Sequence, residues 1–171
     1  MDLKAFIRSI PDFPEPGILF RDVTPLLQSP HAFGAAIDLL AEYVKSRSPE
    51  AVVGIESRGF LFGAPIATRL GLPFVPVRKP GKLPAARMTV EYALEYGSGQ
   101  LDIHSDALAR GQRAVIVDDL LATGGTALGA AKLIELIHGQ VVGMAFLIEL
   151  ADLPGRERLS NYDVFTAIAY D

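Results

Sequence analysis

Residues 115–127, "VIVDDLLATGGTA", place two adjacent carboxylates a few positions before a glycine-rich turn that carries two threonines. Glycines let the backbone turn tightly with its N–H groups convergent, and a helix that starts at such a turn adds positive potential. The segment lacks the lysine of a Walker A loop, so it fits a single terminal phosphate better than a nucleoside triphosphate. The candidate phosphate loop consists of Ala122, Thr123, Gly124, Gly125 and Thr126.

The two carboxylates, Asp118 and Asp119, require a ligand with hydrogen-bond donors, because ionised carboxylates only accept hydrogen bonds and repel a phosphate. A sugar phosphate has both groups, a phosphate for the loop and a diol for the acids. The same carboxylates could favour positive charge that develops on the sugar ring. The alternative is that Asp119 caps a turn and the glycines only allow close packing, but the order of strand, acid pair and Gly-Gly-Thr favours a ligand site.

Cations gather in two further places. In "IESRGF" (55–60) a strand again leads into a helix, so Arg58 and the backbone at Gly59 can face one anion. The alternative is that Arg58 pairs with Glu56 or another nearby acid. Arg78, Lys79 and Lys82 form a third candidate, and the alternative there is a solvated charge cluster.

Two anion sites that flank a diol site suggest a ribose phosphorylated at both ends, and phosphoribosyl pyrophosphate is such a molecule. We expect Mg²⁺ to accompany the pyrophosphate, held largely by substrate oxygens and water. His31, His104 and His138 show no metal-ligand spacing, so no metal site built by the protein is predicted.

Around these motifs, strands and helices alternate from residue 29 onward. Continuously apolar runs predict strands at 51–55, 73–78, 114–118 and 141–150, and helical spacing predicts helices from Pro30, over 59–70 and over about 126–138. This pattern indicates an α/β fold, a central, mainly parallel β-sheet flanked by helices. In such sheets ligands bind at the carboxyl ends of the strands, where the candidate loops fall.

Two regions break the alternation. Residues 10–25 contain four prolines and cannot form one regular helix, although "ILF" could be a short strand. Residues 79–105 alternate partly between apolar and polar around "GSG", which favours a hairpin, and a long excursion of this kind is often a lid.

Composition limits the classes of function. With 171 residues and 21% charged residues the chain fits one globular domain, and a net charge of −4 argues against a nucleic-acid partner. The absence of cysteine excludes disulfides, zinc fingers and thiol nucleophiles. Neither a signal peptide nor an apolar stretch long enough to span a membrane is recognisable, so we expect a soluble, cytoplasmic protein without a membrane partner.

The motif "VIVDDLLATGGTA" resembles the signature of type I phosphoribosyltransferases. Together with "FPEPGILFRD", "ESRGFLFGAPIA", "RKPGKLP" and "LEYG" it resembles the adenine phosphoribosyltransferase family over nearly the whole chain. The resemblance implies a purine-salvage enzyme that transfers the phosphoribosyl group to N9 of adenine, giving AMP and pyrophosphate with Mg²⁺, in a homodimer. It also implies a base-binding hood at residues 1–28 and a flexible lid within 79–105.

By resemblance, the phosphate loop holds the 5′-phosphate and the acid pair holds the ribose hydroxyls. Glu95 is the implied general acid/base near purine N7, with Tyr96 on the same lid. Two alternatives stay open: transfer to another base, and a regulatory module that binds phosphoribosyl pyrophosphate without catalysis. The implied pyrophosphate site comprises Glu56, Ser57, Arg58, Gly59, Arg78, Lys79 and Lys82, and the implied adenine pocket comprises Leu19, Phe20 and Arg21.

Overall fold

Five parallel strands form the central sheet, in the order β4-β3-β7-β8-β9. The predicted α/β class is therefore confirmed, and the run at 164–170 adds a strand that was not predicted. All residues of β3 are buried, as expected for a parallel strand covered on both faces. The strands are β3 (Ala51–Ile55), β4 (Phe74–Val77), β7 (Arg113–Leu121), β8 (Gln140–Leu150) and β9 (Val164–Tyr170).

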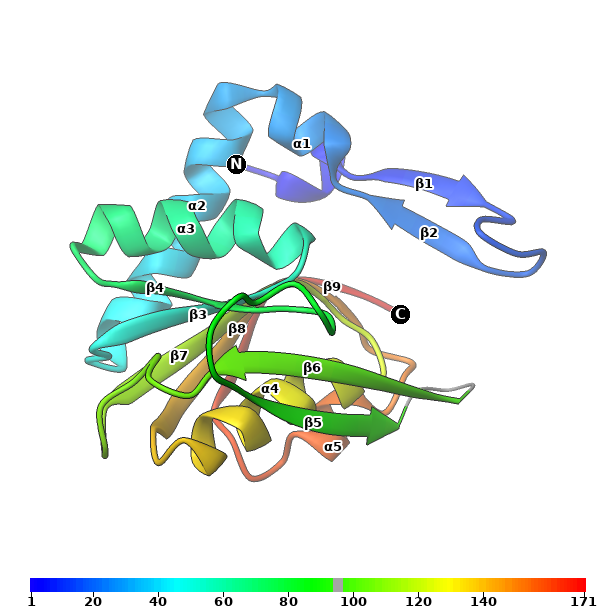
Figure 1. Ribbon diagram of the computed structural model, residues 1–171. Coiled ribbons are helices and arrows are strands. Elements are labelled where there is room, and N and C mark those ends of the chain that lie inside the picture. The colour runs from blue at the N-terminus through cyan, green and yellow to red at the C-terminus, as the bar shows by residue number, and fades with distance from the viewer. Residues whose placement is uncertain (94–96) are drawn as a thin grey trace. The chain divides into compact units, whose positions relative to one another are not determined.

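The computed structural model describes residues 1–93 and 97–171, and the chain divides into two compact units, Met1–Leu39 and Leu40–Asp171. The N-terminal unit includes the predicted hood segment and extends beyond it. It holds η1 (Leu3–Phe6), β1 (Arg8–Pro11), β2 (Leu19–Asp22), α1 (Thr24–Gln28) and the first residues of α2 (Pro30–Ser46) (Figure 1).

In the N-terminal unit, β1 and β2 pair antiparallel across the proline-rich segment. The strand predicted at "ILF" is present as β2, whereas β1 was not predicted. The carboxylate of Asp12 accepts the N–H of Gly17 at 2.8 Å and closes the connection between the strands. The predicted start of α2 is confirmed, because the hydroxyl of Ser29 accepts the N–H of Ala32 at 3.3 Å.

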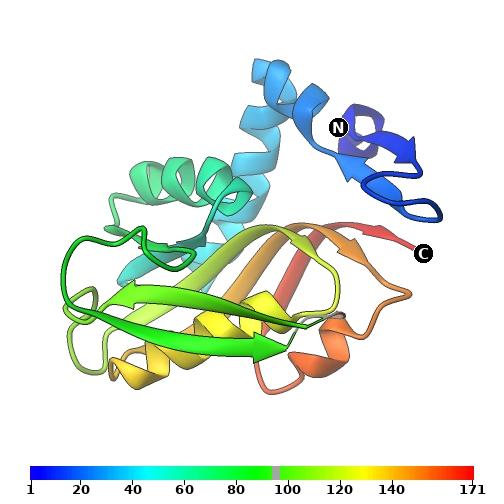
Figure 2. The same ribbon diagram turned by 45° about the vertical axis from the view of Figure 1, so that its right-hand side comes forward.

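In the larger unit, the two crossover helices lie on opposite faces of the sheet (Figures 1 and 2). Helix α3 (Arg58–Leu70) connects β3 to β4 and ends at Gly71, whose φ of 65° stops the helix as predicted. Helix α4 (Gly125–Leu136) connects β7 to β8 in the other direction along the sheet. The two connections diverge between β3 and β7, and ligands of open α/β sheets bind at such a switch point.

The predicted hairpin in 79–105 is confirmed as β5 (Arg87–Ala93) paired antiparallel with β6 (Ser98–His104). Its apolar residues Leu101 and Ile103 join the buried core on the α4 side of the sheet. Backbone hydrogen bonds between Arg78 and Asp102 attach the hairpin to the end of β4. A short helix, α5 (Gly155–Arg158), follows β8. None of the helices in residues 1–93 and 97–171 has the length and apolar character needed to cross a bilayer.

Candidate active site

A cavity of about 340 Å³ lies where the carboxyl ends of β3 and β7 meet. It gathers residues from the candidate phosphate loop, the acid pair and the first cationic loop, which are distant in sequence. The sheet order therefore brings together the residues that the sequence motifs selected. The cavity is lined by Glu56, Ser57, Arg58, Lys79, Asp118, Asp119, Leu120, Leu121, Ala122, Thr123, Gly124, Gly125, Thr126, Ala127 and Phe146.

The phosphate loop turns at Gly124, which has a left-handed φ of 79°, and α4 begins at Gly125. The carbonyl of Gly124 accepts the N–H of Leu128 at 3.0 Å, so the N–H groups of the first turn point out of the helix end. A Cβ on Gly125 would lie 2.5 Å from the carbonyl oxygen of Ala93, so this position also requires glycine. The geometry is that of an anion cradle built from backbone dipoles.

The acid pair lies inside β7 and not in the loop after it. The strand was predicted to end at Asp118 but continues to Leu121, because Leu120 and Leu121 keep their register with Ile148 and Glu149 of β8. Asp119 is only 5% exposed. Backbone pairing therefore fixes both carboxylates at the rigid end of the central strand.

Asp118 and Asp119 have different partners. The carboxylate of Asp119 accepts a hydrogen bond from Nε of Arg58 at 2.5 Å. Asp118 accepts the N–H of Asp119 at 2.9 Å, and burial, followed by the charge of Asp119, raises its pKa well above the usual value of 3.8. A Cβ on Gly59 would lie 2.7 Å from Oδ1 of Asp118, so glycine at this position allows α3 to start against the acid pair.

The cationic loops are paired with acids of the cavity. Arg58 pairs with Asp119 on β7. Glu56 accepts Arg78 at 3.2 Å and the backbone N–H of Lys79 at 2.9 Å. Burial alone would raise the pKa of Glu56, but these hydrogen bonds outweigh it and lower the pKa below 4.5. The peptide bond between Glu56 and Ser57 is cis.

Residues 22–170 match the model of the phosphoribosyl transferase domain family. The chain belongs to this family. It is 58% identical over 171 residues, with 100% of both chains covered, to adenine phosphoribosyltransferase of Synechococcus sp.. It is 52% identical over 168 residues to adenine phosphoribosyltransferase of Halothermothrix orenii, covering 98% of this chain and 99% of that one.

Solved structures of the same group have the same fold. The adenine phosphoribosyltransferase of Thermoanaerobacter pseudethanolicus superposes with a TM-score of 0.96 at 53% identity, covering 99% of this chain and 98% of that one. The Saccharomyces cerevisiae enzyme was solved in complex with an imino-altritol bisphosphate and adenine. It gives a TM-score of 0.90 at 41% identity, with coverages of 97% and 96%.

Several residues implied by the resemblance to this phosphoribosyltransferase family lie outside the cavity lining. Gly59 packs against Asp118 and Arg78 pairs with Glu56, both of which line the cavity. Lys82 is exposed, and its carbonyl accepts Nη1 of Arg78 at 3.4 Å. Glu95 and Tyr96 lie outside the described residues. Conversely, the cavity is also lined by four residues to which the sequence analysis gave no role: Leu120, Leu121, Ala127 and Phe146. Phe146 belongs to β8, and its proximity follows only from the pairing of Asp118 with Phe146.

The residues of the expected adenine pocket belong to the N-terminal unit. Leu19 is 47% exposed, and Phe20 packs edge-on against Phe13 with ring centroids 5.1 Å apart. Arg21 donates from Nη1 to the hydroxyl of Ser9 at 2.5 Å. This strand therefore offers an aromatic ring, an exposed aliphatic side chain and a guanidinium on one short element.

Proposed function

We propose that this chain catalyses transfer of the 5-phosphoribosyl group from phosphoribosyl pyrophosphate to N9 of adenine, giving AMP and pyrophosphate. The observation that carries the proposal is one cavity in which a backbone phosphate cradle, an acid pair and an arginine loop lie side by side. That set matches a sugar with anions at two ends and hydroxyls between. The relatives reported above are named for transfer to adenine.

Each end of the substrate has a candidate site. We assign the 5′-phosphate to the loop 122–126, where backbone N–H groups and the hydroxyls of Thr123 and Thr126 can donate. Pyrophosphate is assigned to the side of Arg58, with Arg78, Lys79 and Lys82 assisting, some of them from a partner subunit. The ribose hydroxyls would then donate to Asp118 and Asp119.

Substrate entry requires an exchange of partners at Arg58. Arg58 neutralises the buried carboxylate of Asp119. When the ribose hydroxyls donate to Asp119, the guanidinium can turn to the pyrophosphate and form two parallel hydrogen bonds with it. The arginine side chain is 43% exposed, so the exchange gives up a pair already weakened by solvent.

The chemical step breaks the bond between ribose carbon 1 and the pyrophosphate oxygen while N9 of adenine forms the new bond. Positive charge develops on the ribose ring, and the carboxylates beside it can stabilise that charge more in the transition state than in the ground state. We assign Glu95 as the acid/base that exchanges a proton at purine N7, with Tyr96 on the same lid. Leu19, Phe20 and Arg21 are assigned to the adenine, for which an aromatic ring offers stacking.

We propose that Mg²⁺ binds together with phosphoribosyl pyrophosphate. Asp118 lines the cavity beside the phosphate loop, so a hard cation there would find carboxylate oxygen in addition to the pyrophosphate and ribose oxygens. When bound, the ion would neutralise charge on the leaving pyrophosphate. The carboxylate of Asp119 already accepts a hydrogen bond from Arg58, so most ligands of the ion would come from substrate and water.

We also propose a homodimer and a cytoplasmic location. The exposed position of Lys82 in a cationic loop supports the dimer, since this lysine could reach a neighbouring subunit's pyrophosphate. The absence of cysteine fits a reducing compartment. Sedimentation equilibrium at micromolar concentration tests the dimer, and a monomer would remove this role of Lys82.

A direct assay tests the function. The purified chain is incubated with phosphoribosyl pyrophosphate, Mg²⁺ and one base at a time (adenine, hypoxanthine, guanine, xanthine or orotate), and the nucleotide is identified by mass. We expect AMP from adenine alone. A nucleotide from another base would reassign the acceptor, and binding of phosphoribosyl pyrophosphate without any product would favour the regulatory module.

A further inference from the structure

The phosphate loop touches the backbone that starts α5. A Cβ on Gly124 would lie 2.9 Å from the carbonyl oxygen of Gly155, and a Cβ on Gly155 would overlap the carbonyl oxygen of Ala122. Both segments therefore meet backbone to backbone, without a side chain between them. The position of Gly155 consequently sets the space in which the loop can turn.

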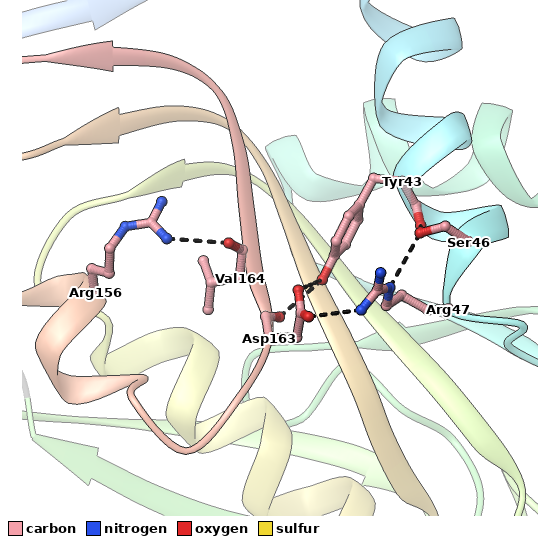
Figure 3. Close-up of polar contacts among 6 residues, drawn as sticks. All are labelled: Tyr43, Ser46, Arg47, Arg156, Asp163 and Val164. Atoms are coloured by element: carbon pink, nitrogen blue, oxygen red, sulfur yellow. Dashed lines mark hydrogen bonds and ion pairs between the residues drawn. The ribbon is translucent and has the colours of Figure 1, made fainter.

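The residue after Gly155 fixes this backbone to the sheet. Arg156 donates from Nε and Nη2 to the two carboxylate oxygens of Glu149 on β8, at 2.8 and 2.6 Å. Its Nη1 donates to the carbonyl of Val164 at the start of β9, at 3.1 Å (Figure 3). Thr166 of β9 completes the group by donating to Glu149 at 2.7 Å.

The charges of this pair depend on each other. Glu149 is 6% exposed, yet the hydrogen bonds from Arg156 outweigh burial and lower the pKa of Glu149. The pKa of Arg156 is raised by the same hydrogen bonds. A buried carboxylate that lost this partner would be uncompensated, so the pair strongly favours one arrangement. A helix of four residues is not stable by itself, so α5 depends on contacts of this kind with the rest of the fold.

We propose that Glu149 and Arg156 are positioning residues for the phosphate loop, an inference that rests on the proposed function of that loop. Neither belongs to the described residues that line the cavity. Their ion pair holds Gly155 against Ala122 and Gly124, and so holds the loop in the shape that receives a terminal phosphate. Loosening the pair should weaken phosphate binding and leave the pyrophosphate side unchanged.

The chain offers a matched control on the other side of β9. Arg47, the residue after α2, pairs with Asp163 at 2.7 Å, and Asp163 also accepts the hydroxyl of Tyr43 at 2.7 Å (Figure 3). Asp163 immediately precedes Val164, the residue whose carbonyl Arg156 reaches. Breaking this second pair loosens the same strand but touches neither α5 nor the phosphate loop.

The test compares Arg156→Gln and Glu149→Gln with the control Arg47→Gln. Calorimetric titration gives Kd for ribose 5-phosphate and for pyrophosphate, and thermal unfolding gives Tm. We expect Kd for ribose 5-phosphate to rise about 10- to 100-fold in the first two variants, as for a misplaced binding group, with Kd for pyrophosphate nearly unchanged. Arg47→Gln should lower Tm without moving either Kd.

Conservative variants keep the test decisive if Arg156→Gln does not fold. Arg156→Lys retains the charge but not the two-pronged contact, and Thr166→Val removes one hydrogen bond, so both should raise Kd by smaller factors. An unchanged Kd for ribose 5-phosphate in the folded variants would overturn this inference alone. If the parent protein does not bind ribose 5-phosphate, the assignment of the loop fails, and the inference fails with it.

Discussion

The phosphate loop at 122–126 carries no charged side chain, whereas the pyrophosphate side at 56–58 and 78–82 carries two arginines, two lysines and a glutamate. The first offers backbone N–H groups at the end of α4, held in place by a left-handed glycine. The second offers side chains that already pair with acids, Arg58 with Asp119 and Arg78 with Glu56.

This difference suggests two modes of anion binding in one cavity. Backbone dipoles of the phosphate loop need no rearrangement, so that end is preorganised for a group that stays bound from substrate to product. Ion pairs at the other end must exchange partners, which suits a leaving group that has to depart. Variants that act on one end only should therefore separate binding of the retained phosphate from binding of the pyrophosphate.

The largest effect is expected at Glu95, which we assign to neither end. Glu95→Gln should lower kcat by about 10²- to 10⁴-fold, the usual contribution of a positioned acid/base group. Affinity for phosphoribosyl pyrophosphate should barely change, because the substitution leaves the phosphate loop and Arg58, to which we assign the substrate's anions, unaltered. Steady-state kinetics with direct binding measurements check this, and full activity in Glu95→Leu would leave the acid/base unassigned.

Next in size is the acid pair between the two ends. Asp118→Asn combined with Asp119→Asn should fold and lose about 10²- to 10³-fold in kcat, because the amides cannot stabilise positive charge on the ribose. The measurement is kcat at saturating substrates, with circular dichroism as the check on folding. Near-parental kcat would make the pair structural.

Gly124→Ala should act on the phosphate end alone. Gly124 has a φ of 79°, which alanine rarely adopts, and a Cβ at this position would press on the backbone of Gly155. The loop must therefore shift. We expect Kd for AMP to rise about 100-fold, as for a misplacement of about 1 Å. Gly71→Ala is the control, since Gly71 has a φ of 65° and nothing within 4 Å of an added Cβ. Equal effects on Kd from both variants would contradict the assigned cradle.

Arg58→Ala should act on the pyrophosphate end. Removing one charge-assisted contact should weaken pyrophosphate and phosphoribosyl pyrophosphate by about 10- to 100-fold, whereas AMP, which lacks the leaving group, should lose much less. Arg58→Lys should recover only part of the loss, because an ammonium cannot form two parallel hydrogen bonds. Calorimetric Kd values for the three ligands decide, and an equal loss for AMP would place Arg58 elsewhere.

The same comparison shows what the sequence could reveal. The phosphate loop was predictable because local rules create it: a strand, two glycines and the first turn of a helix. The strand at 51–55 and the helix stop at Gly71 were predictable for the same reason. Local signals also located the hairpin in 79–105, though not its attachment to Arg78 through Asp102.

The pairings of the pyrophosphate end were not predictable, because they join residues far apart in the chain. Arg58 and Asp119 are 61 positions apart, and the sheet order alone decides that they meet. The extension of β7 beyond Asp118 to Leu121 was missed because aspartate is disfavoured in strands, yet pairing with β8 overrides this preference. The inclusion of Phe146 in the cavity likewise depends on strand register.

The smallest predicted effect concerns stability, and it should differ in sign between Glu56 at the pyrophosphate end and Asp118 in the acid pair. Glu56 has a lowered pKa in the fold, so its contribution is present above the ordinary value of 4.5 and is lost as pH falls through the folded-state pKa. Asp118 has a raised pKa, so stability falls as pH rises from 3.8 through its folded-state pKa.

At neutral pH, Glu56→Gln should therefore destabilise the fold by about 1 kcal/mol, and Asp118→Asn should stabilise it by a similar amount. Urea unfolding of both variants at pH 7 and pH 4 measures this, with a smaller difference between them expected at pH 4. Destabilisation by both variants at pH 7 would show that Asp118 stabilises the fold at neutral pH, and the expected contrast between Glu56 and Asp118 would then be wrong.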